Sequence, residues 1–169
     1  MSDDSSMLSP NKQMKSRALQ TILIAGLIAG TLDITYACTF AYLRRGIKPM
    51  AVLQSVASGA LGRDAAAAGG AKTAALGLFF HFLIALIWAT VYYLASRVIP
   101  FMNQHAVISG LLYGLCIYFF MYGLVLRYSA IHSTVYPWSY PWVVLLCNIG
   151  IHMLGIGLTI ALVTRKFSK

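Results

Sequence analysis

Long apolar segments separated by short polar stretches make up most of this 169-residue chain. The apolar segments cover residues 18–43, 73–95, 106–126 and 141–163. A helix rises about 1.5 Å per residue, so about 20 apolar residues are needed to cross a hydrocarbon core about 30 Å thick. The segments lack the alternation of apolar and polar residues that marks the strands of a membrane barrel, and helices pair their backbone polar groups internally. The pattern therefore predicts an all-α, polytopic membrane protein in which four transmembrane helices form one bundle.

The longest loop, between the first two apolar segments, contains a helical pattern of its own. Its apolar residues recur at helical spacing, at Met50, Leu53, Val56, Ala57, Ala60 and Leu61. Pro49 suits the first turn of a helix, and Gly62 suits the residue after its end. Because the segment is too short to span a bilayer, we predict an interfacial amphipathic helix over residues 49–62, parallel to the membrane plane. A re-entrant element is the alternative.

The composition supports the membrane assignment and limits the partners. Hydrophobic residues make up 59% of the chain, and the mean hydropathy is +0.74. The 13 basic residues outnumber the 4 acidic ones, but they gather at the ends of the apolar segments, as cations do that contact lipid head groups. No basic patch is interleaved with exposed aromatic residues, which argues against nucleic acid as a partner. The expected partner is the lipid bilayer.

The two ends of the chain and its loops bear on orientation. Residues 1–17 are expected to form a polar, disordered tail, and residues 164–169 a basic tail. Four spans put both tails on one side of the membrane. Segment 136–142 repeats Tyr-Pro-Trp and carries no charge, as in an aromatic belt on the translocated face, so both termini are expected in the cytoplasm. The basic first loop favours the opposite orientation.

Small residues mark the faces along which the helices are expected to pack. Gly26 and Gly30 form one GxxxG pair, Gly110 and Gly114 form another, and Gly77 lies in a looser small-residue pattern. Small residues four apart let helix backbones approach closely in lipid. Two uses of these faces are open. They pack the helices of one bundle, or one of them mediates a homodimer.

Each apolar segment also carries a polar residue at a similar depth. These residues are Asp33, His81, Tyr118 and His152, with Asn148 one turn before His152. Counting from the membrane face that bears the first loop places Asp33 roughly 15 Å deep, and the other three between roughly 12 and 16 Å. Asp33 shares a helical face with Gly26 and Gly30, which directs it into the bundle. The sequence therefore predicts a polar intramembrane centre.

Two interpretations of this centre are open. A carboxylate inside a span costs about 3 kcal/mol and normally faces a partner or a cavity, so we predict a direct or single-water hydrogen bond between Asp33 and His81. In the first interpretation, the centre handles protons or a small solute. In the second, Asp33 and His81 serve only helix packing, and the protein has a structural or partner-binding role.

The sequence gives little support for catalysis. No HxxxH or HExxH spacing is present, and a metal site needs three or four convergent ligands. No Ser or Cys is placed beside a base, and the glycines form no phosphate-binding pattern. We expect no cofactor and no metal, and a role other than that of an enzyme is favoured.

A set of short motifs spread along the chain carries a family resemblance. They are residues 25–30 (Ala-Gly-Leu-Ile-Ala-Gly), His81, Tyr92, residues 97–100 (Arg-Val-Ile-Pro), Gly110, the Pro-Trp pair at 141–142, and His152. In these features the chain resembles the YagU-like family of small bacterial inner-membrane proteins of unknown function. The resemblance implies a bacterial inner-membrane location and supplies no activity.

Overall fold

The computed structural model describes residues 10–167, with side chains from residue 16 onward. Within that part the chain is helical, with short connections and no strand. The elements are α1 (Pro10–Arg45), α2 (Pro49–Leu61), α3 (Arg63–Ala68), α4 (Gly70–Val98), α5 (Pro100–Gln104), α6 (Ala106–Phe120), η2 (Met121–Val125), α7 (Leu126–Tyr128), η3 (Pro137–Ser139), α8 (Trp142–Gly150), η4 (Ile151–Gly157) and α9 (Leu158–Phe167). The segments η2 and η4 are π-helical, and η3 is a short 3₁₀ turn.

Four continuous helical stretches are long and apolar enough to cross a membrane. They are Ser16–Arg45, Gly70–Val98, Ala106–Tyr128 and Trp142–Phe167, and they are 23 to 30 residues long. These stretches confirm the four predicted spans and the all-α class. The last two run without a break through the π-helical segments, so each of these spans is one continuous helix that contains a π-helical segment.

The first helix begins earlier than the sequence pattern indicates. The predicted polar tail covers residues 1–17, but α1 starts at Pro10, so residues 10–17 form its first turns. Proline is accepted in the first turn of a helix, and the Lys, Gln, Met and Arg residues that follow it are good helix formers. Hydrophobic periodicity marks where a helix is buried and not where it starts. Residues 1–9 and 168–169 lie outside the described part of the chain.

Large apolar side chains face outward, and small ones face inward. Leu43 is 78% exposed, Val98 81% and Trp142 73%, whereas the buried interior contains many alanines, among them Ala25 and Ala89 with no exposed surface. In water this arrangement would leave a large apolar area unfavourably hydrated, but in lipid it costs nothing. Small interior residues let the helix backbones approach closely. The architecture is that of a multi-pass membrane protein.

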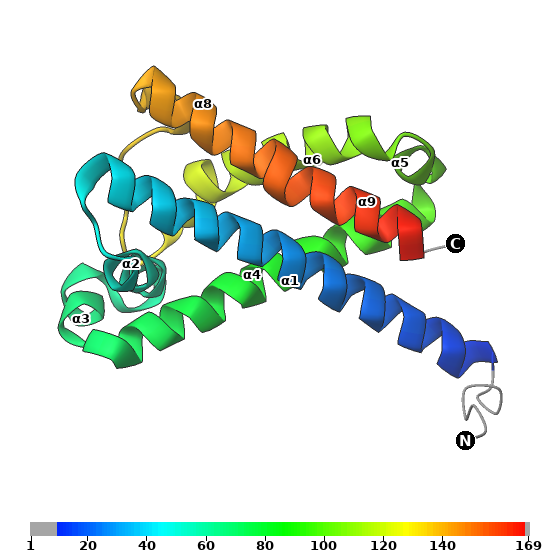
Figure 1. Ribbon diagram of the computed structural model, residues 1–169, viewed down its shortest axis with the longest axis horizontal. Coiled ribbons are helices and arrows are strands. Elements are labelled where there is room, and N and C mark those ends of the chain that lie inside the picture. The colour runs from blue at the N-terminus through cyan, green and yellow to red at the C-terminus, as the bar shows by residue number, and fades with distance from the viewer. Residues whose placement is uncertain (1–9, 168–169) are drawn as a thin grey trace.

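The four spans are arranged unequally around the bundle. The first span packs against α4 on one side and against η4 and α9 on the other, and α6 packs against η4 and α9. Figure 1 shows the start of α1, the end of α9 and the short α5 at one end of the bundle, with α2 and α3 at the other. The second and third spans are also neighbours, but α4 and α6 have few close backbone approaches. Aromatic side chains bridge these two helices instead, and Tyr113 Oη donates to the Trp88 carbonyl over 2.7 Å.

The glycines of the predicted packing faces lie at helix crossings inside the bundle. A Cβ added to Gly26 would lie 2.7 Å from Leu86 Cδ2, and one added to Gly30 would lie 2.9 Å from Phe82 Cδ1. The other predicted packing glycines are equally close to a neighbouring helix: Gly77 meets the Leu53 carbonyl of α2, Gly110 meets Ala161 and Gly157, and Gly114 meets the His152 carbonyl. These faces are therefore occupied within one chain. A dimer formed through them would require the bundle to open.

The loop helix is present at the predicted residues, Pro49–Leu61, and packs tightly on the first half of α4. Figure 1 shows α2 nearly end-on, whereas α1 and α4 run across the view, so α2 crosses both spans steeply. Gln54 Nε2 donates to the Gly70 carbonyl over 3.1 Å and anchors α2 to the start of α4. Its position parallel to the membrane plane stays a prediction.

Candidate functional site

A cavity of about 580 Å³ lies between the spans near the α2 end of the bundle. Residues of α1, α2, α4, η2 and η4 line it, together with parts of α6, α7, α8 and the segment that follows α7. It lies where α4 and α6 diverge, beside the aromatic bridge made by Trp88. Most of its lining residues are apolar. Four of the five residues predicted for the polar centre line it: Asp33, His81, Asn148 and His152.

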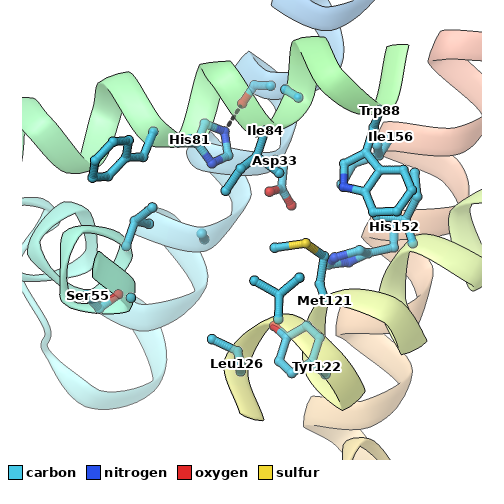
Figure 2. A pocket seen from close by; sticks show the side chains of 18 of the residues that line it. Asp33, Ser55, His81, Ile84, Trp88, Met121, Tyr122, Leu126, His152 and Ile156 are labelled. Atoms are coloured by element: carbon cyan, nitrogen blue, oxygen red, sulfur yellow. Dashed lines mark hydrogen bonds between the residues drawn. The ribbon is translucent and has the colours of Figure 1, made fainter. Parts of the chain in front are cut away.

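The Asp33 carboxylate enters the cavity from the middle of α1. Gly30, one turn earlier, packs against α4, so this face of α1 points inward and carries Asp33 with it. Figure 2 shows the carboxylate in the space between His81 and His152. Within residues 16–167 no hydrogen bond or ion pair engages it, and no lysine or arginine lines the cavity. Asp33 is thus an acidic group in the middle of an apolar helix, without a bonded partner among residues 16–167.

The structure contains no direct hydrogen bond between Asp33 and His81, and the single-water alternative stays a prediction. His81 Nε2 lies 2.8 Å from the carbonyl oxygen of Gly30. Because a carbonyl only accepts, Nε2 carries the proton and donates, which leaves Nδ1 as the acceptor in the neutral ring. Gly30 has no side chain to cover its carbonyl, so α4 approaches closely enough for His81 to reach the backbone. Matching depths alone do not establish a side-chain pair.

His152 is held by its own helix and faces the same cavity. The residue is 7% exposed, and Nδ1 donates to the Asn148 carbonyl over 2.8 Å. Nε2 is therefore the acceptor in the neutral ring. Asn148 is held in turn from α1, because Tyr36 Oη donates to Asn148 Oδ1 over 3.2 Å. These bonds tie the first and fourth spans together on one wall of the cavity.

Tyr118 does not line the cavity, which corrects its predicted place in the polar centre. Its hydroxyl donates to the Pro137 carbonyl over 2.7 Å, and the side chain is completely buried. Residue counting gives the depth of a side chain but not its direction around the helix, and Tyr118 points toward the segment before α8. Tyr122, which sequence reasoning missed, lines the cavity one turn later. Its ring centre lies 5.9 Å from that of His152.

Both π-helical segments border the cavity. Met121 and Tyr122 belong to η2, and His152 and Ile156 belong to η4. A π turn inserts one extra residue into a helix, so the side chains beyond it point in a different direction from those of a regular α-helix. Such insertions occur frequently at functional sites. No pattern in the sequence marks these turns, which explains why Tyr122 escaped prediction.

Metal binding finds no support in the geometry. Among the residues that the structure describes, no three His, Cys, Asp or Glu side chains converge as metal ligands. The free cysteines Cys38, Cys116 and Cys147 lie on three different helices. The site therefore offers one carboxylate, two imidazoles, the Asn148 amide and the polar groups of three aromatic side chains, among walls that are mostly apolar.

No family model, curated protein or solved structure matches the chain. The fold and the cavity alone define its class, a multi-pass helical membrane protein with a partly open cavity between its spans that reaches a carboxylate.

Proposed function

We propose that this protein binds protons or a small solute in the cavity and passes them across the membrane, with Asp33 as the central group. The single observation that carries the proposal is the cavity that reaches an unpartnered carboxylate. If Asp33 served helix packing alone, a bonded partner on a neighbouring helix would be expected, because an unpaired charge in a low dielectric is unfavourable.

The size and the place of the cavity support a binding role. Sites for small molecules commonly measure about 300 to 1,000 Å³ and combine apolar walls with a few polar groups, and they often lie between the helices of a bundle. The cavity has this size and this character. The α4–α6 side is bridged by side chains and not by close backbone packing, so these two helices can separate at lower cost than the glycine crossings elsewhere.

The location proposed is a bacterial inner membrane with both termini in the cytoplasm. The end of α9 and the start of α1 lie at the same end of the bundle, as an even number of spans requires. The resemblance to the YagU-like family supports the inner membrane. The aromatic segment 136–142, at the opposite end from the termini, supports the orientation.

A second candidate, a structural membrane protein without transport, is favoured by the bonds of the two histidines. His81 donates to the Gly30 carbonyl of the first span and so helps to hold two helices together, whereas His152 donates to a carbonyl of its own helix. Under this candidate the cavity is a packing gap, and Asp33 has no functional part.

Flux measurements separate the two candidates. Protein is reconstituted into liposomes that contain a pH-sensitive dye, and the decay of an imposed pH gradient is followed with and without a panel of small solutes. We expect wild type to exceed protein-free liposomes at least tenfold for protons or for one of the solutes. Asp33→Asn should lose this activity. Asp64→Asn changes an exposed aspartate of α3 away from the cavity and should keep it. Equal rates for wild type and Asp33→Asn would favour the structural candidate.

A further inference from the structure

The cavity wall carries one acidic side chain, that of Asp33. Asp33 presents a carboxylate, which in its ionised form only accepts. The one N–H of each neutral imidazole is already bonded to a backbone carbonyl, which leaves His81 Nδ1 and His152 Nε2 as acceptors. No lysine or arginine whose side chain the structure describes lines the cavity. The charge of the cavity wall is therefore complementary to a ligand that brings positive charge.

Aromatic residues line the same cavity as the carboxylate. Tyr36 lies one turn after Asp33 on α1, Trp88 belongs to the α4 wall, and Tyr122 belongs to η2. Figure 2 shows Trp88 and Tyr122 on the side of the cavity that holds His152. The face of an aromatic ring attracts a cation within about 6 Å, most strongly where water is excluded. The walls thus favour an organic cation through its apolar body and through its charge.

The cavity is too large for a bare inorganic ion to be the ligand that fits it best. A cavity of about 580 Å³ is far larger than a coordinated metal ion. Such an ion requires several converging ligands, and within residues 16–167 no group of three His, Cys, Asp or Glu side chains supplies them. An organic cation loses little on entering, because its surface is largely apolar and its single charge meets the single carboxylate.

From these observations we infer that the cavity takes a monovalent organic cation with an apolar body, such as an aromatic or alkyl ammonium, and that it pairs the charge with Asp33. The inference rests on the proposed function and specifies its solute. An anion of the same size would lie beside the carboxylate with no cation to offset the repulsion. We therefore expect that the cavity does not bind it.

Equilibrium dialysis of the purified protein in detergent tests the charge preference. Tetraphenylphosphonium and tetraphenylborate have nearly the same size and shape but opposite charge, and benzyltrimethylammonium serves as a smaller cation. We expect saturable binding of at least one cation, about one per chain, that is weakened at least tenfold by Asp33→Asn and is unchanged by Asp64→Asn. Tetraphenylborate should show no binding that depends on Asp33.

Three results would overturn the inference: no saturable binding of either cation, equal cation affinity in wild type and Asp33→Asn, or Asp33-dependent binding of tetraphenylborate. Asp33→Glu keeps the charge and should retain binding within about tenfold, which distinguishes loss of charge from loss of fold. Elution as a single peak on gel filtration is required of every variant.

The outcomes also separate this inference from the proposed function. Asp33-dependent cation binding without flux would leave the ligand class in place and reject transport. Asp33-dependent flux of protons or of an uncharged solute, without cation binding, would support the proposed function and reject the ligand class.

Discussion

The α6–η4 side of the bundle and the α4–α6 side differ in the size of the residues at the interface. On the first, Gly110, Gly114 and Gly157 bring two backbones into contact, and no space remains between the helices. On the second, Trp88 and Tyr113 hold two helices apart, and the cavity lies beside them. In a membrane, where lipid competes equally for apolar surface, the size of the interface residues decides which helices touch. Small residues thus close one side, and large rings keep the other side from closing.

The largest effect on stability is expected on the closed side. In Gly114→Ala the added Cβ would overlap the His152 carbonyl, and backbone rather than a flexible side chain would have to move. We expect a loss of about 1–3 kcal/mol, because overpacking of a tight contact costs that much. The measurement is thermal unfolding in detergent.

Gly150→Ala is the matched control for that change. Gly150 is also helical, but a Cβ there meets no atom within 4 Å. Removing a helical glycine where there is space should leave the melting temperature unchanged or raise it slightly. A similar loss in both variants would mean that close packing at Gly114 does not set the stability of this side.

The second effect in size concerns the carboxylate in the cavity. Because Asp33 has no bonded partner within residues 16–167, Asp33→Asn removes an uncompensated charge and should raise stability by up to about 2 kcal/mol. A purely structural Asp33 predicts the opposite sign. Thermal unfolding without added ligand decides between them, and a lower melting temperature for Asp33→Asn would show that the carboxylate is bonded in the folded protein.

A smaller effect distinguishes the two tyrosines of the third span. Tyr118→Phe loses the buried hydrogen bond to the Pro137 carbonyl and should cost about 1 kcal/mol, with no specific change in ligand binding. Tyr122→Leu removes an aromatic ring from the cavity wall and should weaken binding of the cation probes more than it alters stability. Parallel melting and dialysis measurements check both. Weaker cation binding in Tyr118→Phe, with unchanged binding in Tyr122→Leu, would contradict the place of Tyr122 in the site.

The smallest change in stability is expected from filling the cavity. Ala37 lines it and is half-buried, so Ala37→Leu adds its side chain to space that already exists. Stability should change by less than about 1 kcal/mol, whereas cation binding should weaken at least tenfold. Ala57→Leu is the control. Ala57 is completely buried at the α2–α4 contact, so the larger leucine side chain finds no free space there and should destabilise the protein. Unchanged binding in Ala37→Leu would place the ligand elsewhere.

The sequence alone determined the class, the four spans and the loop helix. A span needs a certain length of apolar residues, and Pro49–Leu61 follows a 3.6-residue period, so both are local properties that can be read from the chain. The inward direction of Asp33 was also predictable, because Asp33 shares a face with Gly30. Small residues along a span indicated the packing faces, but not which helix would occupy each one.

The contacts within the site were decided only by the tertiary structure. His81 bonds the Gly30 carbonyl instead of Asp33, because the closest acceptor depends on how near two backbones come. Tyr122 replaces Tyr118 on the cavity wall, because a π turn redirects side chains and leaves no mark in the sequence. The cavity lies beside the one side of the bundle, between α4 and α6, where the backbones do not approach closely and side chains bridge the helices. Local residue types fix the helices, whereas the space left between them depends on every crossing in the bundle.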